Sequence, residues 1–326
     1  MAAFHYVVAE RGLECDAPFP ELPECPVRAA KLPSIRVGLS AAPESIPRSV
    51  CWFDPQDSPA EPSNDVLRIG TFDEGYVVDY PGFGQFAISA AGDWIRCCLL
   101  PGIPEATARH MLLDKALPLA LSLDGDVVLH AGGIAVEDCG LALVGASGRG
   151  KSTLVAYLGS QHAEALTDDC LVVRRVDGEW HAIPYYQGLR LWPESLVELA
   201  PLGLQASADA AAGEKRRIAC SGMLRFRTSA VPLRTIVFLA DPADEVEVPA
   251  LVRLPPREAF FSLLAATFCL ELRAAPALRN QFDLIGRLVD EVPAYALSFP
   301  RHFATLGAVG AAVLSTLSST GAATRP

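Results

Sequence analysis

The sequence has no excess of basic residues and no long apolar runs. Its 27 lysines and arginines are outnumbered by 38 aspartates and glutamates, which gives a formal net charge of −11 at pH 7. A field of that sign repels a phosphate backbone, so we expect no nucleic-acid partner. The apolar stretch near the C-terminus, LGAVGAAVLSTL, spans only about a dozen residues, whereas a membrane helix needs roughly 20. We therefore expect no membrane span.

The cysteines lack the spacing of a metal site or of a disulfide framework. Nine are present, an odd number, without a C-x-x-C pair and with Cys97 beside Cys98. This pattern favours reduced, mostly buried thiols over structural zinc or disulfides. The N-terminal MAAFHYVVAERG also lacks the basic segment and apolar run of a secretory signal. We expect a soluble, cytoplasmic protein.

The composition changes along the chain in a way that predicts two domains. Residues 13–65 are rich in proline, which predicts loops and short edge strands. Residues 75–99 carry short apolar runs separated by glycine and aspartate, typical of antiparallel strands, and residues 105–123 have helical spacing. We predict a smaller, mainly β N-terminal domain over residues 1–120 and an α/β domain over residues 121–326.

Within the second domain, strand and helix patterns alternate. DVVLHAGGIAVEDCGLALVG predicts two strands joined by the four-residue turn EDCG, and the helix after it is expected to end at Gly159 as a C-cap. A small-residue stretch, residues 205–213, predicts a mobile loop. The remaining patterns predict strands at residues 170–176 and 234–241, and helices at residues 257–272 and 277–292.

One segment, LVGASGRGKST, predicts a phosphate site. Gly145, Gly150, Lys151 and Ser152 satisfy G-x-x-x-x-G-K-[ST], between an apolar strand pattern and a helix pattern. Lys151 would reach the β and γ phosphates, and the Ser152 hydroxyl would ligate Mg²⁺. The alternative is a glycine-rich turn that binds nothing. The expected phosphate-binding residues are Gly145, Ala146, Ser147, Gly148, Arg149, Gly150, Lys151, Ser152 and Thr153.

Three further residues flank this segment with side chains suited to proton transfer. Asp168 and Asp169 precede an apolar run, and adjacent carboxylates on an extended backbone point in different directions, so one can face a metal and the other an acceptor hydroxyl. An exposed acidic turn is the alternative. His130 ends a predicted strand. A hairpin centred between Asp138 and Cys139 places it opposite the start of the phosphate loop, although on position alone a histidine at a strand end is more often structural.

VLHAGG, GASGRGKST and LTDDCLVV, in this order and spacing, resemble the catalytic domain of the HPr kinase/phosphorylase family. Those proteins are P-loop kinases whose core is similar to that of phosphoenolpyruvate carboxykinase. The resemblance implies that ATP and Mg²⁺ are the cofactors and that Gly145 to Ser152 bind the nucleotide phosphates. It assigns Asp168 as the general base, Asp169 as the Mg²⁺-side carboxylate and His130 as a residue assisting the base, with the two aspartate roles exchangeable.

The segment GLRLWP resembles peptide-modifying relatives of that family, such as lasso-peptide tailoring kinases. Its Arg190 either contacts a phosphate or is solvated before a helix that starts at Pro193. Lys215, Arg216 and Arg217 either clamp a phosphate or acidic peptide, or form a solvated loop. No glycine-rich phosphorylase signature is recognisable, and the first 120 residues do not match that family's N-terminal domain. Neither phosphorolysis nor HPr as substrate is therefore expected.

The resulting hypothesis is an ATP-dependent kinase that phosphorylates a serine or threonine hydroxyl of a peptide or small protein. Two alternatives stay open: a small-molecule hydroxyl kinase of the same fold, and a nucleotide-binding regulatory protein without transfer. Assembly into a homo-oligomer is compatible with all three.

Overall fold

The computed structural model describes residues 3–39, 50–52, 67–161, 163–205, 215–218, 223–241, 246–270 and 275–321. The chain divides into two compact units, Met1–Asp126 with Phe268–Ala274, and Val127–Thr267 with Ala275–Pro326. Residue 120, near which the sequence predicts a boundary, lies within the last helix of the first unit. Of the predicted small-residue loop, residues 206–213 lie outside the described residues.

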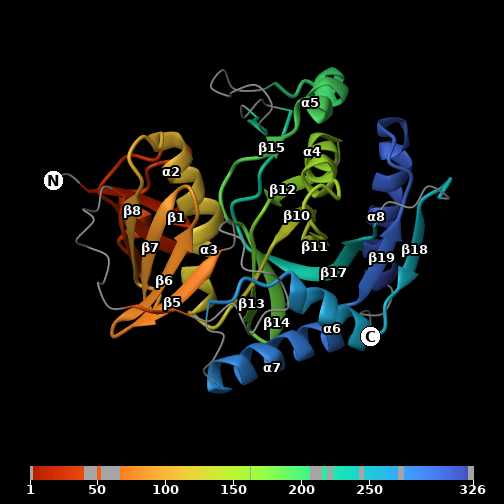
Figure 1. Cartoon of the computed structure of the whole chain (residues 1–326). Helices are drawn as coiled ribbons and strands as arrows, with labels where there is room; N and C mark the ends of the chain where they lie inside the picture. Colours follow the sequence, from red (N-terminus) through yellow and green to blue (C-terminus); the bar gives the residue numbers. More distant parts are fainter. Residues whose placement is uncertain are drawn as a thin grey trace. The chain divides into compact units, whose positions relative to one another are not determined.

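The first unit is built on an eight-stranded sheet with the order β1-β2-β3-β8-β7-β6-β5-β4 (Figure 1). Its strands are β1 (Phe4–Val8), β2 (Arg11–Cys15), β3 (Ser34–Gly38), β4 (Cys51–Trp52), β5 (Arg68–Phe72), β6 (Gly75–Tyr80), β7 (Gly84–Ser89) and β8 (Trp94–Leu99). Its helical segments are α1 (Pro26–Ala29), α2 (Glu105–Met111), the π-helix η3 (Leu112–Ala116) and α3 (Leu117–Ser122).

The predicted antiparallel strands over residues 75–99 are confirmed, since β6, β7 and β8 pair in that way. The prediction of only edge strands in the proline-rich stretch is wrong for β3. This strand lies inside the sheet and is parallel to both β2 and β8. Its five residues, SIRVG, contain no proline, so every residue keeps the N–H that a central strand needs.

The second unit is a mixed α/β structure with a nine-stranded sheet and a separate two-stranded sheet, β15-β16. Its strands are β9 (Val127–Leu129), β10 (Ala131–Val136), β11 (Cys139–Val144), β12 (Glu164–Thr167), β13 (Leu171–Val176), β14 (Glu179–Ile183), β15 (Arg190–Leu191), β16 (Arg216–Arg217), β17 (Val231–Leu239), β18 (Ala250–Arg253) and β19 (Ala294–Ser298). Its helices are α4 (Lys151–Gln161), α5 (Pro193–Leu199), η4 (Ala200–Leu202), α6 (Pro256–Ala265), α7 (Ala275–Glu291), η5 (Phe303–Thr305) and α8 (Leu306–Gly321).

The β10–β11 hairpin has a shorter turn than the sequence predicts. Val136 pairs with Cys139, so the turn is Glu137–Asp138 and not EDCG, and the centre lies one residue earlier than expected. Glu137 adopts a left-handed φ of +52°, which suits a two-residue hairpin turn but is uncommon for glutamate. Ala131 pairs with Val144, so the chain before it still leads toward the start of the phosphate loop.

Both faces of the nine-stranded sheet are covered by helices. Along β11, Leu141 and Leu143 point into one apolar cluster, together with residues of α4, α5 and α8. Ala142 and Val144 point into the other, with residues of α6 and α7. Side chains alternate between the faces of a strand, so a strand buried on both faces reads as the continuous apolar run seen in the sequence.

Two predicted helix ends are wrong. Helix α4 continues to Gln161, and Gly159 lies inside it because the helix packs closely there: a Cβ on Gly159 would stand 2.8 Å from Leu224 Cδ1. Helix α6 ends at Ala265, seven residues before the predicted end at residue 272, and the carbonyl of Ala266 instead accepts a hydrogen bond from the His130 N–H. Among the helices of the described ranges, none is long and apolar enough to cross a bilayer.

Three parallel strands bring distant loops to one edge of the sheet. β17 is parallel to β11 on one side and to β19 on the other. Val144 pairs with Phe238, and Phe238 pairs with Ala296, so one row of residues crosses all three strands near their carboxyl ends. Ligands of open α/β sheets bind beyond such carboxyl ends, and the phosphate loop starts there.

Gly132 on β10 offers a test of the packing between this sheet and α4. A Cβ at this position would stand 2.7 Å from Val155 Cγ2 and 3.4 Å from the Asp168 carbonyl oxygen. We expect Gly132→Ala to lower the free energy of unfolding by about 1–3 kcal/mol, the usual effect of overpacking. Chemical unfolding followed by circular dichroism measures this change.

The matched control is Gly286→Ala on α7, where no atom outside the adjoining residues and the backbone of the helix itself lies within 4 Å of the added Cβ. Alanine there should stabilise the helix by up to about 1 kcal/mol. Equal stability of Gly132→Ala and the wild type would contradict the close approach of β10 to α4.

Candidate functional site

The phosphate loop connects the end of β11 with the start of α4. Two of its glycines, Gly148 and Gly150, have φ values of +79° and +91°, a left-handed conformation that favours glycine. Helix α4 begins at Lys151, so the free N–H groups of its first turn face the loop. A loop of this shape before a helix N-terminus is suited to binding phosphate.

The Lys151 ammonium lies over this loop. Its side chain is buried, and Nζ donates hydrogen bonds to the carbonyl oxygens of Gly145 at 2.7 Å and Ala146 at 3.2 Å. The same Nζ is 3.2 Å from Nε2 of His130. The lysine is thus held where phosphate oxygens can replace the loop carbonyls as its partners.

His130 connects this lysine to the acidic pair. Its Nδ1 is 3.1 Å from the main-chain oxygen of Asp169. A carbonyl oxygen only accepts, so Nδ1 carries the hydrogen and Nε2 is left to accept from Lys151, as in a neutral imidazole. His130 thus contacts Asp169 through the main-chain oxygen of that residue.

The two carboxylates of the acidic pair have different surroundings. Asp168 is 4% exposed, and its Oδ2 accepts a hydrogen bond of 2.9 Å from the Arg190 N–H. Its Oδ1 is buried without a hydrogen bond from any described residue. Burial, and secondly the charge of Asp169, raise the pKa of Asp168 to about 7, although the Ser152 hydroxyl, the Arg190 N–H and Lys215 lower it. The Asp169 side chain is half-buried and lines the cavity described next.

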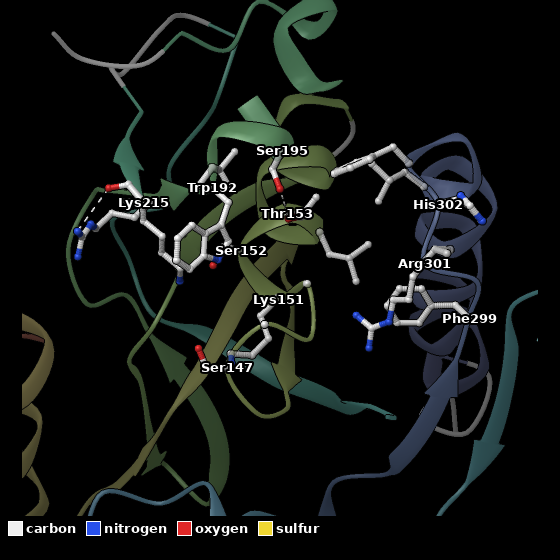
Figure 2. Close-up of a pocket in the computed structure, with 18 of the residues that line it drawn as sticks. Ser147, Lys151, Ser152, Thr153, Trp192, Ser195, Lys215, Phe299, Arg301 and His302 are labelled. Atoms are coloured by element: carbon white, nitrogen blue, oxygen red, sulfur yellow. Dashed lines mark hydrogen bonds between the residues drawn. The ribbon is translucent and has the colours of Figure 1, made fainter. Parts of the chain in front are cut away.

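A cavity of about 210 Å³ lies in front of the phosphate loop (Figure 2). Lys215 and Trp192 lie on one side of Lys151 and Ser152, and Phe299, Arg301 and His302 lie on the other side. Of the predicted site residues, those that line the cavity are His130, Ser147, Gly148, Gly150, Lys151, Ser152, Thr153, Asp169, Arg190 and Lys215.

The other predicted residues lie behind or beside the cavity. The carbonyl oxygens of Gly145 and Ala146 accept hydrogen bonds from Lys151. Asp168 is buried and does not line the cavity. Arg149 forms an ion pair with Asp241. Arg216 and Arg217 are outside the lining, and the Arg217 guanidinium instead stacks over a tyrosine ring. Of Lys215, Arg216 and Arg217, only Lys215 therefore lines the cavity.

Several cavity residues escaped the sequence analysis. The Ser195 hydroxyl is buried 3.0 Å from that of Thr153, and Trp192 stands half-exposed at the cavity edge. Both belong to the GLRLWPES stretch, in which only Arg190 was singled out. Side chains of the segment 299–309 also line the cavity, and the sequence analysis singled out no residue of that segment.

The oxygen donors at the loop fit Mg²⁺ bound together with phosphate. Ser152 offers a hydroxyl, and Asp168 and Asp169 offer carboxylates beside it. Mg²⁺ usually takes one or two carboxylates and fills its other positions with phosphate oxygens and waters. Across the described ranges, no group of three or more His, Cys, Asp or Glu side chains is arranged to hold a metal by itself. The donor set therefore fits a magnesium ion bound together with a nucleotide.

Comparisons with known proteins give a similarity to solved structures. No family model and no curated protein matches this chain. Among solved structures, the Hpr(Ser) kinase/phosphatase from Coxiella burnetii matches 59% of this chain and 97% of its own, with 11% sequence identity and a TM-score of 0.32. A similarity at that level carries no argument about activity, which has to be built on the site itself.

The buried Asp168 carboxyl makes stability depend on pH. Its folded pKa of about 7 lies above the roughly 3.9 of an exposed aspartate, so between these values the folded state binds more protons than the unfolded state. The wild type therefore loses stability as the pH rises toward 7. Asp168→Asn has no charge to bury. From pH 4.5 to pH 7.5, its free energy of unfolding should therefore rise relative to that of the wild type by on the order of 2 kcal/mol.

Thermal unfolding in EDTA buffer at both pH values measures this gain, expected as a few degrees. Asp283→Asn is the matched control, since Asp283 is exposed on α7. A gain by Asp168→Asn that is the same at both pH values would show that the Asp168 carboxyl is not the group responsible.

Proposed function

We propose that this protein is a kinase that uses Mg²⁺ and ATP to phosphorylate a serine or threonine hydroxyl of a peptide or small protein. The observation that carries the proposal is the meeting of Lys151, Ser152, His130 and Asp169 around one cavity in front of a phosphate loop. A phosphate-binding lysine, a hydroxyl suited to magnesium and a carboxylate open to an acceptor are the parts that phosphoryl transfer requires.

The chain's own groups account for the positioning of the donor. Backbone N–H groups of the loop bind the phosphates, and Lys151 exchanges its loop carbonyls for oxygens of the β and γ phosphates. Magnesium, when bound, neutralises part of the charge that develops on the transferred group. The two ring nitrogens of His130 contact Nζ of Lys151 and the main-chain oxygen of Asp169, and they hold these two residues in place relative to each other.

The geometry favours one distribution of roles over the acidic pair. Asp168 is buried beside the Ser152 hydroxyl and is held by the Arg190 N–H, which suits the metal side. Asp169 faces the cavity, which suits the general base. This exchanges the roles first expected from the sequence. Asp169 would take the hydroxyl proton while the acceptor oxygen bonds to the γ-phosphorus and the bond to the β–γ bridging oxygen breaks, releasing ADP.

The acceptor class rests on the cavity edge. Lys215 and Arg190 carry positive charge and line the same cavity as Asp169, and Trp192 adds a half-exposed aromatic surface. Together with the resemblance of GLRLWP to peptide-modifying kinases, these residues favour a peptide that carries acidic or aromatic side chains near its hydroxyl. A cytoplasmic location and assembly into a homo-oligomer stay predictions.

Three substitutions test the proposal. Lys151→Ala should abolish measurable ATP binding, because the main phosphate cation is lost. Asp169→Asn should keep ATP affinity within about threefold while transfer falls by about 10²–10⁴-fold, since the base is lost but the donor site is not. Asp168→Asn should weaken ATP binding in magnesium buffer more than in EDTA. Calorimetry and transfer of labelled γ-phosphate into a library of serine and threonine peptides measure these changes.

The matched control is Lys115→Ala, an exposed lysine in the first unit, which should leave both quantities unchanged. Transfer by Asp169→Asn at the wild-type rate would overturn the assignment of the base. ATP binding without transfer to any acceptor would favour a regulatory protein, and transfer to metabolites alone would favour a small-molecule kinase.

A further inference from the structure

We propose that residues 299–309 form the subsite for the base of the nucleotide, an inference that rests on the proposed function. This segment follows β19 and runs through η5 into the start of α8. Its side chains make up an apolar part of the cavity wall, contributed by Phe299, Pro300, Phe303, Leu306 and Val309. The ligand of this wall is the aromatic base of a nucleoside triphosphate.

The position of the wall follows from the direction of phosphoryl transfer. The acceptor oxygen approaches the γ-phosphorus opposite to the leaving β-phosphate, so the acceptor and the nucleoside lie at opposite ends of the reacting group. Asp169 suits the acceptor end. The Arg190 N–H donates to Asp168, the neighbour of Asp169 in the chain, and the Arg190 guanidinium lies 3.4 Å from the Lys215 carbonyl oxygen, so the acidic pair lies toward Lys215. Figure 2 shows Lys215 on one side of the phosphate loop and Phe299 on the other. The nucleoside therefore extends toward residues 299–309.

The wall is fixed to the phosphate loop by one side chain, Arg301. Its Nη1 donates a 2.6 Å hydrogen bond to the Arg149 carbonyl within the loop, and its Nη2 donates a 3.0 Å hydrogen bond to the Ala240 carbonyl after β17. The same guanidinium stacks on the Phe299 ring at 4.5 Å. A base held by this wall is thus kept at a constant distance from phosphates held by the loop.

The segment is also braced internally. The Thr305 hydroxyl donates to the carbonyl of His302 at 2.7 Å and lies 3.2 Å from that of Pro300. Thr305 and Arg301 donate hydrogen bonds to backbone carbonyls, so the wall has its shape before a ligand binds. Binding therefore loses little conformational entropy in this segment. Flat aromatic bases gain affinity from packing on such preformed apolar surfaces.

The test compares ATP with inorganic tripolyphosphate, which has the three phosphates but no nucleoside. Calorimetry in magnesium buffer should show that the wild type binds ATP more tightly than tripolyphosphate. Phe303→Ala removes a half-buried ring from the wall and should weaken ATP about tenfold while leaving tripolyphosphate binding unchanged. Phe261→Ala, which removes an exposed ring from α6, is the matched control and should change neither affinity.

Binding of tripolyphosphate also reports that each variant has a folded phosphate loop. Photolabelling of the wild type with 8-azido-ATP gives a second measurement, and the label is expected on residues 299–309. Equal affinities for ATP and tripolyphosphate, an unchanged ATP affinity in Phe303→Ala, or a label on the Trp192 side would each overturn this subsite while leaving the phosphate site intact. Failure of the wild type to bind either ligand would overturn the proposed function together with the subsite.

Discussion

The parallel pairing of β17 with β11 and β19 is the constraint on which the candidate site depends. Backbone hydrogen bonds place Val144, Phe238 and Ala296 in one row, so three strands end at the same edge of the sheet. The segments that follow them are the phosphate loop, Ala240 with Asp241, and residues 299–309. The first and the last of these segments are far apart along the chain, since Arg149 and Arg301 are separated by 152 residues.

Local hydrogen bonds then convert this proximity into a defined geometry. Arg301 bonds to carbonyls after two of the three strands, and Lys151 bonds to the carbonyls that begin the phosphate loop. His130 extends the arrangement to the acidic pair through the backbone of Asp169. Each of these bonds satisfies a carbonyl in a loop that leaves the sheet, which is why loops without regular structure hold a constant shape.

The sequence was most informative where the relevant residues are neighbours along the chain. The phosphate loop was predicted correctly as a strand–loop–helix unit because its glycines, its lysine and the flanking apolar runs are contiguous. The hairpin turn was misplaced by one residue because Glu137 adopts a left-handed φ, for which glutamate gives no signal. The end of α4 was misplaced because Gly159 serves close packing against Leu224, and a helix terminus would have used the same residue.

The residues that were missed depend on contacts between distant segments. Nothing near residues 299–309 resembles a binding motif, and only the pairing of β19 with β17 brings this segment to the loop. The different environments of Asp168 and Asp169 were equally hidden. Adjacent carboxylates were expected to point apart, but which one is buried depends on Arg190, 22 residues further on, whose N–H bonds to Asp168. A tertiary contact therefore helps to decide which of the two adjacent carboxylates is buried, which the local sequence pattern does not show.

The contrast between the two ends of the cavity has a physical reason. In the proposed reaction, proton removal from a hydroxyl needs a carboxylate, and hydrogen bonds link the acidic pair to Arg190 and Arg190 to the backbone of Lys215. Those charges would be costly beside an apolar ligand surface, because desolvating them without a partner destabilises the complex. Phe299, Pro300 and Phe303 occupy the other end, where packing can hold a ligand without disturbing the titrating groups. In the proposed complex, the phosphate loop lies between these two environments and keeps the charged chemistry apart from the apolar contact with the nucleoside.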